Sequence, residues 1–289
     1  MADIFSRTRR LIGEEGLAVL GRSRVVIVGL GGVGSFATEA LARAGIGHFV
    51  LVDFDDVDVT NVNRQLHAFP DTAGIPKVEL MRDRVLRINP GARVVALKKF
   101  VSGDARKDTT GEIPAGKIPS EEIPAEEIVA GPCDYLVDAC DTVATKVALA
   151  ACCARLGVPI VSSMGAGNRL DPTRFRVADI SRTHTCPLAR AVRQGLRRIG
   201  ITSGLTVVFS DEKPRKAYIG VNGGEGGEDR QIHEDGGLGE CLDGHAHATT
   251  RGPGSISFVP SVAGLILAGV VVNDLLRSHG LEGVDLRDG

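Results

Sequence analysis

Residues 24–34 read RVVIVGLGGVG, and this stretch decides the fold of the chain. The β-branched run at 25–28 is typical of a buried parallel strand. The loop after it matches the G-x-G-x-x-G pattern, in which glycines let the backbone approach a phosphate closely. The helix expected at 35–44 would add free N–H groups and a positive dipole end. The loop glycines are Gly29, Gly31, Gly32 and Gly34.

Strands and helices alternate on either side of this loop. We predict strands at 48–53, 93–97, 135–137, 159–162 and 205–209, and helices at 9–20, 77–88, 142–156, 187–199 and 258–278. This alternation predicts an α/β fold, a Rossmann-like, doubly wound and mostly parallel sheet with an elaborated C-terminal half. No linker is visible, so we expect one domain over 1–289, with a nucleotide-binding part at 1–165 and a substrate-side part at 166–289.

Two segments break the alternation. Residues 103–132 contain the near-repeat EIPAGKIPSEEIPAEEI, whose prolines exclude a continuous helix. Residues 222–254 are rich in glycine and acidic residues and show no periodicity. Segments of this composition bury little apolar surface. We therefore expect flexible insertions at 103–132 and at 222–254.

Bulk composition excludes several classes of protein. Tryptophan is absent and aromatic residues make up 4%, which argues against recognition of single strands mainly by stacking. Six cysteines without a C-x-x-C pair argue against a disulfide framework and a zinc ribbon. The charged N-terminus lacks a secretory signal. The apolar run 258–272 is short for a membrane span. We expect a cytoplasmic protein with no membrane partner.

The loop alone does not separate a dinucleotide-binding redox protein from an ATP-binding enzyme. Asp53, at a strand end, suits the hydroxyls of a ribose in either case. Further polar residues follow in VDFDDVDVTNVNRQLHA and beyond it, and they favour attack on a phosphate, which needs cations and a magnesium-binding carboxylate. These residues are Asp55, Asn61, Arg64, Gln65, Lys77 and Asp141.

The motifs V-V-I-V-G-L-G-G-V-G and D-F-D-x-V-x-x-x-N-x-x-R-Q, with Lys77 and Asp141, resemble the adenylating domain of the ThiF/MoeB and ubiquitin-activating-enzyme family. The resemblance implies that Asp53 binds the ribose of ATP, that Arg64 and Lys77 bind its phosphates, and that Asp141 binds Mg²⁺. It also implies a homodimer, in which an N-terminal arginine reaches the partner's site. Arg10 is the best match for that arginine, with Arg9 second.

A finer resemblance is to the branch of this family that dehydrates threonylcarbamoyladenosine in tRNA. It rests on FSRTRRLIGEEGL, TNVNRQLHA, SSMGAGNRLDPTRFRVADI and SRTHTCPLARAVRQGLR. It implies that the threonine carboxylate is adenylated and that the ureido group then closes a ring, releasing pyrophosphate and AMP. Proximity of the two groups would be the main catalytic effect of that step.

The charge distribution is consistent with tRNA as a partner. Between residues 174 and 216, ten basic residues stand against three acidic ones, a local charge of +7 in a chain of net charge −2. Such a patch suits contacts to phosphates, although an amphipathic surface helix would look similar. The candidate tRNA-binding residues are Arg182, Arg190, Arg193, Arg197 and Arg198.

Other functions remain open from the sequence. An activating enzyme would adenylate the C-terminus of a ubiquitin-like or sulfur-carrier partner, and some such enzymes use a cysteine nucleophile. Cys241 is a weak candidate because its neighbours are acidic, and Cys186 does not match either. Cys241, His245 and His247 could also form a metal site, without an obvious fourth ligand. A scaffold that holds a nucleotide structurally is disfavoured by the charged set around the loop.

Overall fold

The structure is a computed structural model. It describes residues 3–103, 121–216, 218–219, 230–231 and 253–287. The expected insertion 222–254 therefore falls almost entirely outside the described residues, as do residues 104–120 of the other one.

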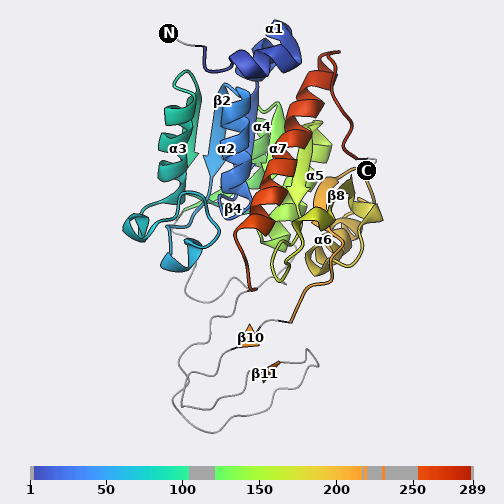
Figure 1. Ribbon diagram of the computed structural model, residues 1–289. Coiled ribbons are helices and arrows are strands. Elements are labelled where there is room, and N and C mark those ends of the chain that lie inside the picture. The colour runs from blue at the N-terminus through green and yellow to red at the C-terminus, as the bar shows by residue number, and fades with distance from the viewer. Residues whose placement is uncertain (1–2, 104–120, 217, 220–229, 232–252, 288–289) are drawn as a thin grey trace.

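A seven-stranded sheet forms the centre of the molecule (Figure 1). Its order is β3 (Arg93–Leu97), β2 (His48–Val52), β1 (Arg24–Val28), β6 (Tyr135–Asp138), β7 (Ile160–Ser163), β9 (Thr206–Ser210) and β8 (Phe175–Asp179). Every neighbouring pair is parallel except β8 with β9, which is antiparallel. The prediction of a doubly wound, mostly parallel sheet is confirmed.

Helices cover both faces of this sheet. One hydrophobic core joins it to α2 (Gly34–Ala44), α3 (Lys77–Ile88) and α7 (Phe258–Ser278). Two further clusters join its other face to α4 (Ala125–Ala130), α5 (Val143–Leu156) and α6 (Pro187–Arg198). α1 (Ser6–Arg22) lies at the end where the strands begin (Figure 1).

Short elements complete the fold. They are β4 (Phe100–Ser102) with β5 (Glu122–Pro124), β10 (Tyr218–Ile219) with β11 (Arg230–Gln231), and the 3₁₀ turns η1 (Val59–Asn61), η2 (Pro70–Thr72), η3 (Pro172–Arg174) and η4 (Ile180–Arg182).

α7 is a buried helix, as the sequence predicted. It is the one helix among the described residues that is long and apolar enough to cross a membrane by composition. Nevertheless, Val259, Ala263, Leu267 and Val271 are fully buried in the core against the sheet and α2.

The prediction of a flexible insertion at 103–132 was wrong for the last third of that segment. Residues 122–130 form β5 and α4, and Ile123, Ile128 and Val129 are buried in a cluster shared with β1, β2 and α5. Pro124 stands at the N-cap of α4, where a proline breaks no helix. Two smaller features were also not predicted from the sequence. They are the edge strand β8 and a break in α1 at Gly13, where φ is +75°.

The path of the chain reverses beside β1. The chain runs from β1 out to β2 and β3, and then crosses to β6 on the other side of β1. Ligands of doubly wound sheets bind in the crevice at such a switch point, outside the carboxyl ends of the strands. The fold therefore places the candidate site at the lower end of the sheet in Figure 1, opposite α1.

The packing of α7 on α2 gives a first prediction. A Cβ added at Gly264 would lie 2.3 Å from the carbonyl oxygen of Val33 and 3.0 Å from the nitrogen of Ala37. Gly264→Ala should therefore lower the free energy of unfolding by about 1–3 kcal/mol, which urea denaturation would measure. Gly131→Ala is the matched control, because its Cβ would meet nothing within 4 Å. Equal stability of the two variants would contradict the packing.

Candidate nucleotide and substrate site

The glycine loop connects β1 to α2 and packs against the end of β6. Gly29 has φ +89°, and a Cβ there would lie 2.7 Å from the backbone of Ala139 and Cys140. A Cβ at Gly34 would lie 1.8 Å from the carbonyl oxygen of Gly29. At Gly31 the nearest atom would be the Nε2 of Gln65, 3.9 Å away. The loop is thus closed toward the sheet and open on the side where a phosphate would approach.

Asp53, at the end of β2, holds this loop in place. Its Oδ2 accepts a hydrogen bond from the N–H of Leu30 at 2.6 Å, and its Oδ1 accepts one from the N–H of Asp55 at 2.8 Å. Burial raises the pKa of this carboxyl, while the positive charge of Lys77 acts in the opposite direction. The lone pairs left on the two oxygens can still accept from ribose hydroxyls.

Lys77 and Asp55 form an ion pair beside the loop. The Nζ of Lys77 lies 2.8 Å from the Oδ2 of Asp55, and Lys77 is only 4% exposed. The two residues predicted from the sequence are therefore together, and their charges oppose each other. A bound triphosphate would share the ammonium group with Asp55.

The turn after β2 carries the remaining predicted ATP ligands. Gln65 is buried, and its Oε1 has no hydrogen-bond partner among the described residues. Asn61 is also buried and accepts from the N–H of Asp58 through its side chain. Arg64 instead donates to the carbonyl oxygen of Thr60 at 2.8 Å, so it stabilises its own turn.

A buried network that the sequence analysis missed lies under Asp141. Asp138 and Lys146 are both fully buried, with Nζ 3.1 Å from each carboxylate oxygen. Ser162 donates to Asp138 at 2.6 Å, and Lys146 also donates to the carbonyl oxygen of Ser163 at 2.7 Å. This network fixes the end of β6 to β7, directly before Asp141.

Asp141 itself is exposed and has no ion-pair partner in the described part of the chain. Asp138 is fully engaged, so of the two carboxylates in DACD only Asp141 is available to a metal. The described residues hold no cluster of three or more metal-ligating side chains. This donor set fits Mg²⁺, which commonly uses one or two carboxylates together with substrate phosphates and water.

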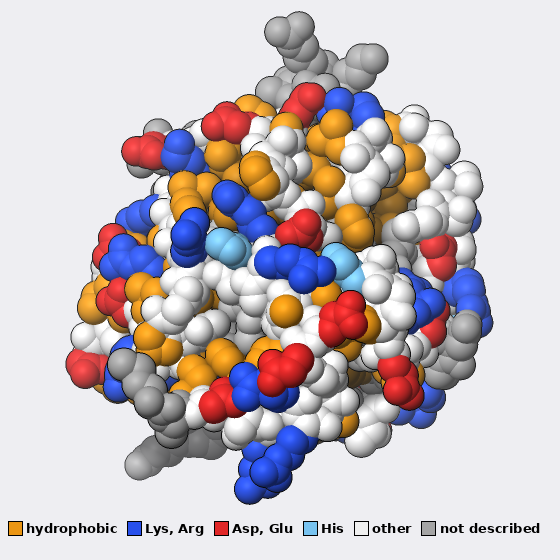
Figure 2. All heavy atoms as spheres, turned by 90° about the horizontal axis from the view of Figure 1, so that it is seen from above, with side chains coloured by type: hydrophobic (Ala, Val, Ile, Leu, Met, Phe, Trp, Pro, Cys, Tyr) orange, Lys and Arg blue, Asp and Glu red, His pale blue; other side chains and the backbone are white. Residues whose placement is uncertain are grey.

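Arg9 and Arg10 lie on α1, at the end of the sheet opposite the loop (Figure 1). Arg9 forms ion pairs with Asp3 and Glu14, whereas Arg10 is exposed. Figure 2, which looks onto the α1 end, shows basic, acidic and apolar side chains interspersed there. Neither arginine is near the loop of its own chain.

Part of the basic surface on and around α6 is engaged in contacts within the protein. Arg174 and Arg176 pair with Asp211, and Arg215 pairs with Glu212. Arg193 donates to the carbonyl oxygen and hydroxyl of Thr183, so it stabilises the loop between η4 and α6. Four of the five candidates remain exposed without an ion pair to another described residue: Arg182, Arg190, Arg197 and Arg198.

The cysteines offer no activated thiol in the described residues. Burial and then the charge of Asp138 raise the pKa of Cys140 well above its ordinary value. Burial raises the pKa of Cys133 to about 11. Cys186 is 3% exposed. Cys241, with His245 and His247, lies outside the described residues.

The chain is similar to known proteins over almost its whole length. The model of the ThiF family matches residues 5–282. The tRNA threonylcarbamoyladenosine dehydratase of Bacillus subtilis is 45% identical over 280 residues, which is 97% of this chain and 97% of that protein. The enzyme of the same name from Escherichia coli is 39% identical and covers 72% of this chain and 73% of its own length.

Solved structures of the Escherichia coli dehydratase are similar to this chain along almost its whole length. The Escherichia coli dehydratase in complex with ATP superposes with a TM-score of 0.73 at 31% identity, covering 96% of this chain and 95% of that one. Its complex with AMP gives a TM-score of 0.74. By contrast, the molybdopterin-synthase adenylyltransferase of Escherichia coli, 38% identical, matches only 54% of this chain and 54% of its own length.

The Asp138–Lys146 pair gives a second prediction. Lys146→Met leaves a buried carboxylate without its cation and should lower the free energy of unfolding by about 3–5 kcal/mol in urea denaturation. The double variant Asp138→Asn with Lys146→Met should recover much of this loss, because no uncompensated charge remains. A double variant as unstable as Lys146→Met would contradict this account.

His67 gives a prediction about pH. It is 3% exposed, and burial, then Lys77 and Arg84, lower its pKa to about 4 from 6.5. The unfolded chain therefore binds the proton more readily, so stability is lost as pH falls from about 6.5 to 4, by about 3 kcal/mol. His67→Leu should flatten this part of the stability–pH curve. An unchanged slope in the variant would refute the assignment.

Proposed function

The chain belongs to the ThiF family, and we propose that it is an ATP-dependent dehydratase of threonylcarbamoyladenosine in tRNA. The observation that carries the proposal is identity of 45% along 97% of both chains to an enzyme of that name. The charged set around the glycine loop supports adenylation rather than hydride transfer, because Lys77, Gln65 and Asp141 suit a triphosphate and its metal.

Different residues bind the parts of ATP and stabilise the adenylation step. The glycine loop and the amino end of α2 bind phosphates, and Asp53 accepts from the ribose. Mg²⁺, held by Asp141, would neutralise charge on the phosphates. The threonine carboxylate attacks the α-phosphorus of ATP, and pyrophosphate leaves. Lys77 stabilises the charge that develops on the phosphate oxygens.

The second step closes a ring within the bound nucleoside. The ureido group attacks the activated carbonyl carbon, AMP leaves, and the nucleoside has lost one water. The attacking group and the carbonyl belong to one molecule, so holding them in contact supplies most of the acceleration. No cysteine takes part, which agrees with the high pKa of the buried Cys140 thiol.

The proposal includes a homodimer in the cytoplasm. Arg10 lies at the end of the sheet opposite its own loop, so it can contribute only to the site of a second copy. The alternative substrate, the C-terminus of a sulfur-carrier or ubiquitin-like protein, has weaker support, because adenylyltransferases of that kind match little more than half of the chain.

The decisive experiment uses purified protein, ATP, Mg²⁺ and tRNA bearing threonylcarbamoyladenosine. We expect release of AMP together with loss of one water from the nucleoside, measured by mass spectrometry. Asp141→Ala should reduce the rate by about 100-fold or more, because it removes the group that holds the metal. Cys241→Ser should keep the wild-type rate. ATP consumption that requires a small carrier protein instead of tRNA would overturn the proposal.

The contribution of Arg10 across a dimer can be tested by mixing two inactive variants. Arg10→Ala and Asp141→Ala subunits, combined after mild dissociation, would form heterodimers in which one site has both wild-type residues. The mixture should regain activity that neither variant has alone. A mixture that stays inactive, although exchange of subunits is shown by mass spectrometry, would exclude action in trans.

A further inference from the structure

Arg169, in the loop after β7, is a buried cation without an acidic partner among the described residues. It is 4% exposed, and its Nε and Nη2 atoms are enclosed without a hydrogen-bond acceptor. Its one described hydrogen bond runs from Nη1 to the carbonyl oxygen of Gly167, at 3.1 Å. Burial of an uncompensated charge is unfavourable, so such a group points to an anion that binds there.

The loop around Arg169 is held on both sides. Asn168 has φ +58°, and its N–H and Oδ1 bond to the carbonyl oxygen and the N–H of Gly254, each at 2.7 Å. The N–H of Asp171 donates to the carboxylate of Glu212 at 2.9 Å. Arg169 is therefore preorganised.

Gly165 lies between the guanidinium of Arg169 and the start of α6. A Cβ at this position would lie 3.7 Å from the Nη1 of Arg169, 3.5 Å from the Sγ of Cys186 and 3.7 Å from the Cβ of Leu188. One point is thus within contact distance of both Arg169 and the first turn of α6.

That first turn offers donors of its own. α6 begins with Pro187, and no side chain caps it. The N–H groups of Leu188 and Ala189 have no acceptor within the described part of the molecule. Free N–H groups at a helix start favour negative charge. Arg169 and the start of α6 are therefore two independent groups that attract an anion, and Gly165 lies against both.

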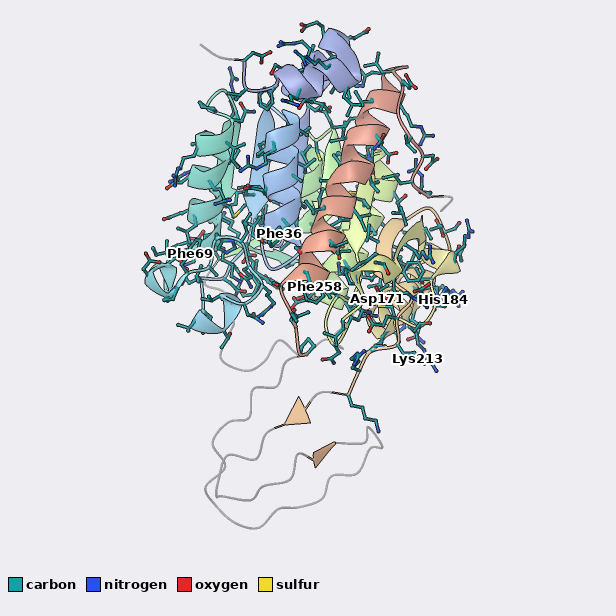
Figure 3. The ribbon with its side chains drawn as sticks, viewed as in Figure 1. Phe36, Phe69, Asp171, His184, Lys213 and Phe258 are labelled. Carbon is teal, nitrogen blue, oxygen red and sulfur yellow. The ribbon has the colours of Figure 1, made fainter. Side chains whose placement is uncertain are left out.

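The place lies on the substrate side of the nucleotide site. β7 is the neighbour of β6, whose end carries Asp141, on the side away from β1 and the glycine loop. Figure 3 labels Asp171, two residues past Arg169, and His184, both toward the end of the molecule where the parallel strands finish. A group that reaches the α-phosphate from beyond β6 would pass this loop.

We infer that Arg169, with the first turn of α6, binds an oxyanion of the RNA substrate, and this inference rests on the proposed function. Two oxyanions of a modified tRNA share the required chemistry: the threonine carboxylate and the backbone phosphate next to the nucleoside. Arg169 binds either of them through its planar donors.

The test compares Arg169→Met with the wild type in tRNA turnover, tRNA binding and ATP binding. Arg169→Met should raise the KM for tRNA by about tenfold or more, the usual effect of losing a charged hydrogen bond. The Kd for ATP should stay within about twofold, and Arg169→Lys should recover part of the loss. Weaker binding of modified tRNA alone identifies the carboxylate as ligand, whereas equal weakening with unmodified tRNA identifies the phosphate.

Thermal unfolding separates binding from a structural role. Arg169→Met should melt at the wild-type temperature or above, because it removes a buried charge that has no acidic partner in the described ranges. Arg193→Met should melt lower, since Arg193 bonds to Thr183. Arg155→Met, on an exposed face of α5, should leave tRNA turnover unchanged.

Three results would overturn the inference. One is an unchanged KM for tRNA in Arg169→Met while the wild type is active, which leaves the proposed function standing. Another is a lower melting temperature of that variant with a parallel loss of ATP binding. A wild-type protein that binds ATP but leaves the tRNA unmodified would overturn both this inference and the proposed function.

Discussion

The close approach of β1 and β6 at their carboxyl ends is the constraint on which the site depends. Gly29 sits so near the backbone of Ala139 and Cys140 that no side chain fits between them. Because of this contact, the glycine loop and Asp141 emerge side by side from two strands that are distant in sequence. Asp53 then fixes the loop from a third strand through the N–H of Leu30. The chemistry is thus assembled by backbone packing before any ligand binds.

Much of the fold could be predicted because its signals are local. The β-branched run of β1, the glycines after it and the proline that follows α3 are each read from a few consecutive residues, and α3 and α7 have the bounds that the sequence predicted. The elements that escaped depend on distant contacts. Ile123 and Ile128 are buried in a cluster shared with β1, β2 and α5, β5 pairs with β4, and β8 pairs with β9.

In the site, too, local motifs could be predicted from the sequence, whereas contacts between distant residues could not. Motifs identified Asp53, Lys77 and Asp141, but the sequence could not show which charge each would face. Asp138 and Asp141 stand three residues apart in DACD. Asp138 is fully buried with Lys146, whereas Asp141 is exposed. Asp138 is the last residue of a strand that is buried throughout, whereas Asp141 lies beyond it, and the position of Lys146 depends on the fold. Arg10 matched a motif, but it lies on α1, at the end of the sheet opposite the glycine loop of its own chain.

The buried cations of this edge differ in how many of their donors the protein itself satisfies. Lys146 has three donors, and Asp138, Ser162 and Ser163 accept from them. Lys77 donates to Asp55, and Arg169 donates to one carbonyl oxygen although a guanidinium has five N–H groups. A fully satisfied cation holds the fold and gains nothing from a ligand, whereas an unsatisfied one is stabilised by binding. Lys77 begins α3, beyond the glycine loop from β6, and Arg169 lies in the loop after β7, on the other side of β6. A triphosphate and a second anionic group would therefore have to meet between them, near Asp141.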